Sequence, residues 1–372
     1  MKVSCLQENL NKGLSIVSRL VSSKTQLPVL NNILISTEKE RLKLSATNLE
    51  TGINLWIGAK VEKEGAISIS SRALTELISS LPAGQINLGG EGELLRISCG
   101  SCEAVLNGLS AKEFPPVPSA SGEPLLSIPT DIFSESISQV ALAAAQDEGR
   151  PALTGVKWFT ESGNLNLVAT DGYRLSLKKT SLKNASLDDG LIIPARALWE
   201  VAHIAQQEEK KEKGVVSLSV LPGENQVSFS MVNVEIATRL IEGEFPAFAK
   251  IIPQETATKV VVERETLLKA TKVASIFARD SANIVKWTVG KGKLTLSANS
   301  PQVGENSSEM EARVEGEEGE IAFNFRFLLD FLGAVKSKEV VFEMSGPLSP
   351  GVFRPSDDDS FLHIIMPVRV QG

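Results

Sequence analysis

The chain is predicted to be an α+β protein made of three tandem copies of one domain, because two blocks of sequence recur at matching intervals. The first block starts at residues 42, 165 and 294 and reads LKLSATN, LNLVATD and LTLSANS. The second block is centred on Arg72, Arg196 and Arg326. A repeat of roughly 125 residues has the size of an independent domain rather than of a solenoid unit. We therefore expect domains at residues 1–122, 123–254 and 255–372.

Each copy opens with apolar residues at helical spacing, which predicts an amphipathic helix. Asp131 is expected to cap the helix of the second copy. The apolar positions are Leu10, Leu14, Val17 and Val21 in the first copy, Phe133, Ile137, Val140 and Ala144 in the second, and Ala270, Val273 and Phe277 in the third.

Alternating apolar and polar residues then predict strands, for example at 33–36 and 156–159, and the arginine-centred block begins a second helix. Each domain is thus expected to hold two helices and roughly eight strands, with the helices on one side of antiparallel sheets. Polar segments containing proline, at 118–124 and 253–258, are expected to link the domains.

Composition is typical of a soluble globular protein, with 42% hydrophobic and 22% charged residues. No apolar run approaches the roughly 20 residues of a membrane span, and the first residues lack a signal peptide's apolar core. Three cysteines do not make a disulfide framework. We expect a cytoplasmic protein without membrane contact.

Residues that could carry catalysis or bind a metal are few. His203 and His363 are interpreted as packed or solvated, and Cys99 and Cys102 as the two ends of a β-hairpin turn. Residues 357–359, all aspartate, are expected in a solvated loop. There is no phosphate-binding glycine loop followed by lysine. We expect no catalytic residue, no metal and no cofactor.

Charge is segregated along the chain although the net charge is −7. The helical windows 7–24, 265–279 and 324–338 each carry a net charge of +2, whereas residues 305–320 carry −6. The window 131–145 of the second copy breaks this pattern, because its only charges are two acids. A basic helical face could attract phosphates while an acidic outer region repels them.

The copies also differ in ways that suggest a binding site. Only the second copy reads ATDGYRL at 169–175 and IEGEFPAF at 241–248, and the last copy ends in HIIMPVRV at 363–370. Glycine and proline beside apolar and aromatic residues, with an adaptable methionine, are suited to a hydrophobic peptide pocket.

These segments, together with Phe323 and Asn324, give the whole chain its resemblance to a family, the bacterial DNA polymerase III beta subunits, which are replicative sliding clamps. The resemblance implies three DNA-clamp domains per subunit and a six-domain ring formed by a head-to-tail homodimer. Such a heterologous contact must close into a ring or grow into a filament. The ring would encircle duplex DNA without reading its sequence and would work by topology, with no catalysis.

The resemblance also implies a hydrophobic groove that binds clamp-binding motifs of the polymerase III alpha subunit, the clamp loader, other polymerases and repair proteins. Its deep subsite would comprise Leu153, Thr170, Gly172, Tyr173, Arg174, Leu175, Pro246, Ile251, Ile364 and Met366. Its shallow subsite would comprise Asn324, Phe327, Leu348, Pro367, Val368 and Arg369. The residues expected to face DNA are Lys12, Lys24, Arg72, Arg150 and Arg196. The ring seam would join Ala104 and Leu106 of one subunit to Ile276 and Phe277 of the other.

The chain departs from the family pattern at Tyr173, where a histidine is common, at the terminal Gln371 and Gly372, and in the charged segment 206–213. Two other functions stay open from sequence alone. One is a three-domain scaffold that binds peptides but not DNA. The other is a hydrolase using the turn at Asp171, which requires a second acid or a metal beside that residue.

Overall fold

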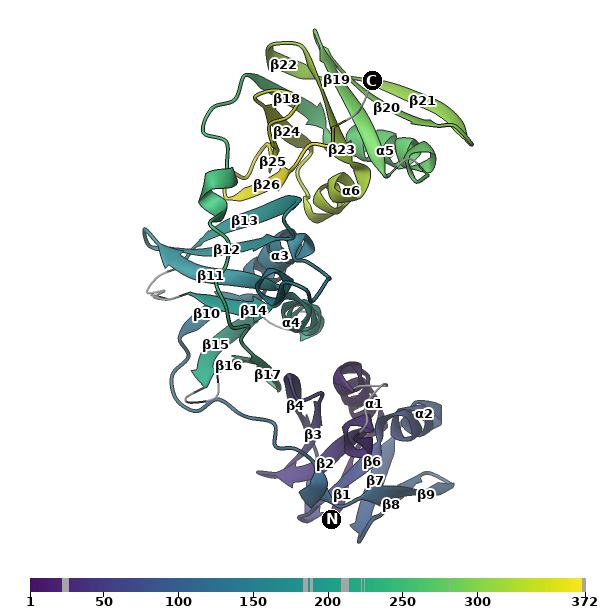
Figure 1. Cartoon of the computed structure of the whole chain (residues 1–372). Helices are drawn as coiled ribbons and strands as arrows, with labels where there is room; N and C mark the ends of the chain where they lie inside the picture. The colour runs from purple at the N-terminus through teal and green to yellow at the C-terminus, as the bar shows by residue number, and fades with distance from the viewer. Residues whose placement is uncertain are drawn as a thin grey trace. The chain divides into compact units, whose positions relative to one another are not determined.

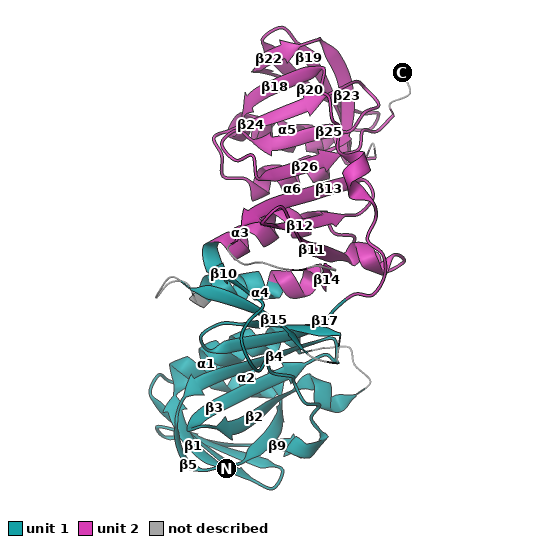
Figure 2. Cartoon of the chain, turned by 90° about the vertical axis from the view of Figure 1, so that its left-hand side faces the viewer, with its two compact units in different colours: residues 1–131, 200–240 teal, residues 132–199, 241–372 magenta. Residues whose placement is uncertain are grey.

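The computed structural model describes residues 1–21, 27–182, 187, 190–208, 214–221, 223, 225–280 and 282–369 (Figure 1). The chain forms two compact units (Figure 2). Unit 1 contains residues 1–131 and 200–240, and unit 2 contains residues 132–199 and 241–372. Lys24, Gln371 and Gly372, and the part of the charged segment at 209–213, lie outside the described residues.

Six α-helices lie within the described residues, two for each copy of the repeat, as the periodicity predicts. Helix α3 begins at Thr130, so Asp131 lies in the first turn and is not the cap that the sequence suggested. The helices are α1 (Gln7–Val17), α2 (Ser71–Ser80), α3 (Thr130–Val140), α4 (Ala195–Glu208), α5 (Arg264–Ala278) and α6 (Phe325–Ala334).

Unit 1 contains one antiparallel sheet, whose strand order is β10-β15-β16-β17-β4-β3-β2-β6-β9-β8-β7-β1-β5. Its strands are β1 (Lys2–Leu6), β2 (Asn32–Glu38), β3 (Arg41–Thr47), β4 (Thr51–Gly58), β5 (Lys60–Lys63), β6 (Ala66–Ser70), β7 (Gln85–Glu91), β8 (Leu94–Cys99), β9 (Cys102–Leu109), β10 (Leu126–Pro129), β15 (Val215–Leu221), β16 (Gln226–Ser230) and β17 (Val234–Arg239).

Unit 2 contains two antiparallel sheets, ordered β14-β11-β12-β13-β26-β25-β24-β18-β22 and β21-β20-β19-β23. Their strands are β11 (Gly155–Glu161), β12 (Asn164–Thr170), β13 (Arg174–Ser181), β14 (Leu191–Pro194), β18 (Thr258–Glu263), β19 (Ile284–Gly290), β20 (Lys293–Ser300), β21 (Gly304–Glu311), β22 (Arg313–Gly316), β23 (Gly319–Asn324), β24 (Glu339–Met344), β25 (Gly351–Pro355) and β26 (Phe361–Ile365).

Successive copies share a sheet through equivalent strand pairs. Strand β4 of the first copy pairs with β17 of the second, and β13 of the second pairs with β26 of the third. The registers also correspond, because Thr51 lies opposite Thr238 just as Arg174 lies opposite Ile365. Each compact unit therefore holds one outer copy and the part of the middle copy that continues its sheet.

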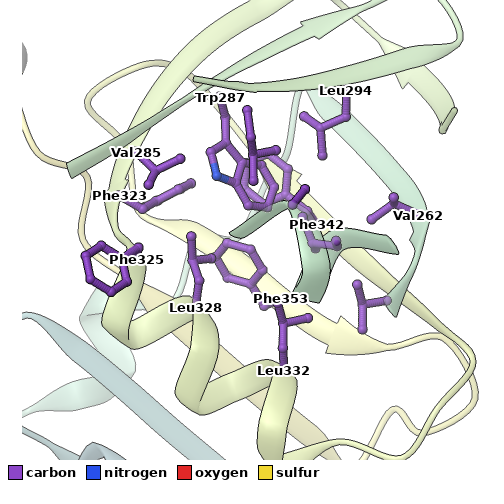
Figure 3. Close-up of a cluster of buried hydrophobic side chains, with 14 of the residues drawn as sticks. Val262, Val285, Trp287, Leu294, Phe323, Phe325, Leu328, Leu332, Phe342 and Phe353 are labelled. Carbon is purple, nitrogen blue, oxygen red and sulfur yellow. The ribbon is translucent and has the colours of Figure 1, made fainter. Parts of the chain in front are cut away.

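The core of the third copy shows how the helices cover the sheets. Trp287 from β19 lies edge-on to Phe342 from β24, with ring centroids 4.9 Å apart, and Leu328 and Leu332 of α6 pack against this cluster (Figure 3). A side chain has no room at Gly351, the first residue of β25, because a Cβ there would lie 2.4 Å from the ring of Phe323. Tight packing of this kind specifies one arrangement of helix on sheet.

Two local predictions can be compared with the structure. Cys99 pairs directly with Cys102 across a turn in which Gly100 has a φ of 58°, so the hairpin is confirmed. The aspartates 357–359 are not simply solvated, because the Asp358 carboxylate accepts a hydrogen bond from the Lys178 ammonium at 2.6 Å.

A row of polar side chains lies on one face of β13 in unit 2. Arg174, Ser176 and Lys178 alternate along the strand and are almost fully buried. His363, opposite Ser176 on β26, is fully buried, which confirms its interpretation as a packed residue. Its Nδ1 lies 2.7 Å from Ser176 Oγ, and its ring stacks on Phe331. Burial, with a smaller contribution from the Arg174 cation, lowers the pKa of His363 to about 3.

We predict that this histidine makes the stability of unit 2 depend on pH. In the unfolded chain His363 binds a proton as the pH falls below its ordinary pKa of 6.5, whereas the folded chain keeps it neutral to about pH 3. The contribution of neutral His363 to the free energy of unfolding is complete above pH 6.5 and decreases as the pH falls below that value. Between pH 7 and pH 5 the loss amounts to about 2 kcal/mol.

Urea unfolding followed at both pH values measures this loss. His363→Gln should remove most of the pH dependence, whereas the exposed His203→Gln variant should retain it. If His363→Gln kept the pH dependence of the wild-type protein, His363 would not be the group that causes it.

Candidate peptide-binding, DNA-facing and seam residues

The turn between β12 and β13 is held by side chains at its two ends. Thr170 Oγ1 donates to the Arg174 carbonyl at 2.6 Å and accepts from the Gly172 N–H at 3.0 Å. Asp171 Oδ1 accepts the N–H groups of Tyr173 and Arg174 at 2.8 and 2.9 Å. Gly172 has a φ of 92°, a conformation that glycine adopts without a steric cost. The ATDGYR sequence therefore specifies one turn geometry.

The first copy builds the same turn from different residues. Thr47 Oγ1 accepts the Leu49 N–H and Asn48 Oδ1 accepts the Thr51 N–H, at 3.0 and 2.7 Å. Leu49, at the position of Gly172, has a φ of 77°. The hydrogen bonds thus fix this turn even where the residue is not glycine.

Arg174 connects the turn to the third copy. Its Nε lies 3.0 Å from Asp171 Oδ2, its Nη1 lies 2.5 Å from Asp330 Oδ2 on α6, and its guanidinium lies 4.4 Å from the ring centroid of Phe327. With only 10% of its side chain exposed, this cation is desolvated and needs both carboxylates. Asp330 was not among the predicted site residues, since its spacing from Arg174 gives no local signal.

Apolar predicted residues from three segments meet beside the turn. Leu175 and Ile364 belong to one buried cluster, and Ile251 packs against it. Leu153 and Thr170 are buried as well. In contrast, Tyr173, Leu348 and Met366 have 66%, 59% and 37% of their surface exposed. Exposed large apolar side chains beside an apolar cluster are typical of a protein-binding surface.

The chain after β26 is bound by backbone hydrogen bonds to the turn before β13 and to β23. The Met366 N–H donates to the Tyr173 carbonyl and the Val368 N–H donates to the Ala322 carbonyl, both at 2.8 Å. Asn324 caps α6 by accepting the Arg326 N–H. Pro367 is partly buried, whereas Pro246 and Arg369 are exposed. We call the sixteen predicted residues in unit 2 the candidate peptide site.

The predicted DNA-facing residues have different surroundings. Lys12 on α1 and Arg196 on α4 are exposed. Arg72 on α2 is exposed but forms an ion pair with Glu76 at 2.9 Å, which raises the pKa of its guanidinium. Arg150 donates to the Asp171 carbonyl at 3.3 Å and so lies against the turn of the candidate peptide site. Lys24 is outside the described residues.

The predicted seam residues lie at or near open sheet edges. Ala104 and Leu106 are on β9, which pairs with β8 throughout but with β6 only at Gly108 and Leu109. Strand β21 is the last strand of its sheet. Helix α5, beside β21, carries Ile276, which is 53% exposed, and Phe277, which is partly buried. Edges of this kind can pair with another chain.

Asp171 does not have the surroundings of a catalytic acid. Its two oxygens hold the turn and the Arg174 guanidinium, and the nearby Asp330 is bound to the same cation. No group of three or more His, Cys, Asp or Glu side chains among the described residues could hold a metal ion. None of the helices in the described part of the chain is long and apolar enough to span a membrane.

Comparisons with known proteins agree over the full length of the chain. Three family models match, for the N-terminal, central and C-terminal domains of the DNA polymerase III beta subunit, at residues 1–118, 127–247 and 249–369. The beta sliding clamp of Synechocystis is 31% identical, with all of both chains covered. That of Bacillus subtilis is 30% identical over 99% of this chain and all of its own.

Solved structures show the same fold. The DNA polymerase sliding clamp from Bacillus subtilis superposes with a TM-score of 0.92 at 29% identity, and the beta subunit from Thermotoga maritima with 0.90 at 29%, each with both chains fully covered. The chain therefore belongs to the DNA polymerase III beta subunit family, the beta sliding clamps, which are non-catalytic processivity subunits of the polymerase.

Proposed function

We propose that this clamp holds a DNA polymerase on duplex DNA by closing around it as a head-to-tail dimer and by binding partner peptides at the candidate peptide site. The observation that carries the proposal is the fixed turn at 170–175, with Tyr173 and Met366 exposed beside the buried Leu175 and Ile364. A fixed backbone with exposed apolar side chains can bind a peptide at a low ordering cost.

The partners at this site would be peptides with apolar anchors, carried by the polymerase III alpha subunit, the clamp loader, other polymerases and repair proteins. Apolar anchors in a buried centre supply most of the affinity of such interfaces. We place the protein in the cytoplasm, at the nucleoid during replication, with domain boundaries near residues 122 and 254. The alternative function is a three-domain scaffold that binds peptides but does not encircle DNA.

Met366→Ala should weaken binding of a clamp-binding peptide from the alpha subunit roughly tenfold, because truncating a well-placed apolar anchor costs about 1–2 kcal/mol. Fluorescence anisotropy of the labelled peptide measures the change. Val232→Ala, which truncates a side chain that is 80% exposed in unit 1, is the control and should bind normally. Equal affinities for Met366→Ala and the control would place the peptide elsewhere.

The exposed cations Lys12 and Arg196 support a contact with phosphates. Lys12→Ala and Arg196→Ala should each weaken binding to duplex DNA without altering sequence preference, and should reduce the dependence of log K on log salt by about 1. Arg72→Ala should have a smaller effect, because Glu76 already pairs with that guanidinium.

The DNA measurement is a salt titration with a labelled duplex. Lys60→Ala, which removes an exposed lysine from β5, is the matched control. Loss of affinity equal to that of Lys60→Ala would show that Lys12 and Arg196 do not face DNA.

Ile276→Asp should convert the dimer into monomers, because a charge would be buried in an apolar seam without a partner. Light scattering should then give a mass near 39.9 kDa instead of twice that value. Retention on circular DNA after loading should be lost as well. Val220→Asp, at a position 46% exposed on β15, should remain dimeric. A dimeric Ile276→Asp protein would contradict the predicted seam.

A further inference from the structure

A pocket of about 230 Å³ lies on the first copy, within unit 1. Its floor is formed by side chains of β2, β3 and β4, and its wall by the segment 114–117, which follows β9. The lining residues are Leu34, Ser36, Lys43, Ser45, Asn54 and the segment Phe114, Pro115, Pro116 and Val117. Nothing in the proposed function uses this pocket.

The second copy allows the pocket to be compared with an equivalent place in the same molecule. Ser36 lies opposite Lys43 in the pair β2–β3, and Phe159 lies opposite Asn166 in the pair β11–β12. Both residues are 123 positions after their counterparts, the interval that separates the first sequence block of the two copies. Phe159 is therefore the structural counterpart of Ser36.

The segments that follow each copy correspond as well. Both carry Glu-Phe-Pro, at 113–115 and at 244–246, so Val117 is the counterpart of Phe248. In the second copy the rings of Phe159 and Phe248 lie 5.9 Å apart, and both pack against the apolar cluster around Leu175. Aromatic rings thus fill in the second copy the place that Ser36 and Val117 leave open in the first.

Polar groups hold the wall of the first-copy pocket in position. Ser45 Oγ donates to Asn54 Oδ1 at 2.7 Å, and Asn54 Nδ2 donates to Ser119 Oγ at 3.2 Å. The Ala120 N–H donates to the Glu235 carboxylate at 2.5 Å, and this carboxylate also accepts from Ser228. The chain directly after the pocket wall is therefore fixed over the sheet by partly buried hydrogen bonds at Ser119 and Ala120, so the wall does not need to collapse onto Ser36.

The chemistry of the lining suits a ring with a polar edge. Phe114, Pro115 and Val117 supply apolar contacts, whereas Ser36 and Lys43 are polar. The Lys43 ammonium is bound to Glu38 at 2.8 Å and lies 5.1 Å from the ring centroid of Trp56. Ser45 and Asn54 add to this polar floor, so the pocket offers an apolar wall facing a polar floor, which suits an aromatic ring that carries a polar group.

We propose that this pocket is a docking site for one aromatic side chain of a partner protein, which occupies in the first copy the place that Phe159 fills in the second. It would give the clamp a contact with partners that is separate from the candidate peptide site. Tyrosine fits best, because its ring meets the apolar wall and its hydroxyl can reach the polar floor.

N-acetyltyrosine amide at millimolar concentration is the probe, and the methyl NMR signals of Leu34 and Val117 in the full-length dimer are the readout. Both signals should shift with the wild-type protein. In Ser36→Phe the new ring should fill the pocket, abolish the shifts and raise the unfolding temperature of unit 1 by roughly 2–4 °C.

The reciprocal variant, Phe159→Ser, opens the equivalent place in the second copy. It should gain probe-dependent shifts at Val168 and Leu177, which should not respond in the wild-type protein. Absence of shifts at Leu34 and Val117 in the wild type, or shifts that persist in Ser36→Phe, would overturn the proposal. Met366→Ala, which tests the candidate peptide site, should leave the response at Leu34 and Val117 unchanged.

Discussion

Backbone hydrogen bonds between β4 and β17, and between β13 and β26, carry each sheet from one copy of the domain into the next. The register of these pairs decides which side chains meet. A slip of one residue between β13 and β26 would move Ser176 and His363 to the opposite face of the sheet. The turn at 170–175 and the chain after β26 are likewise placed by this pairing.

Buried charged side chains lie on and beside the pair β13–β26. Arg174 is held by Asp171 and Asp330, and Lys178 by Asp358, so two desolvated cations are matched by carboxylates from different copies. Loss of one partner would leave an uncompensated charge, which costs more than the intact pair contributes. These pairs therefore specify how the second and third copies fit together within unit 2, while an apolar cluster that includes Leu175 and Ile364 packs on the other face.

Much of this structure can be read from the sequence because it depends on periodicity. The repeated blocks predicted three copies, and apolar spacing together with the arginine-centred block predicted the two helices of each copy. Contacts between distant residues gave no such signal. Neither the bond from Arg174 to Asp330 nor the position of Arg150 against the turn follows from local sequence. The start of α3 was predicted wrongly because an aspartate such as Asp131 is favourable both at the cap position and within the first turn of a helix.

The backbone of Tyr173 is fixed on both sides, since its N–H is bound by Asp171 and its carbonyl by the Met366 N–H. Its side chain is nevertheless largely exposed. The first copy shows that such a turn persists even with Leu49 in the left-handed conformation. Because these bonds are made by the main chain of Tyr173, its side chain can be replaced without disturbing the turn around it. A single substitution there would change the exposed surface of the clamp while its fold stays the same.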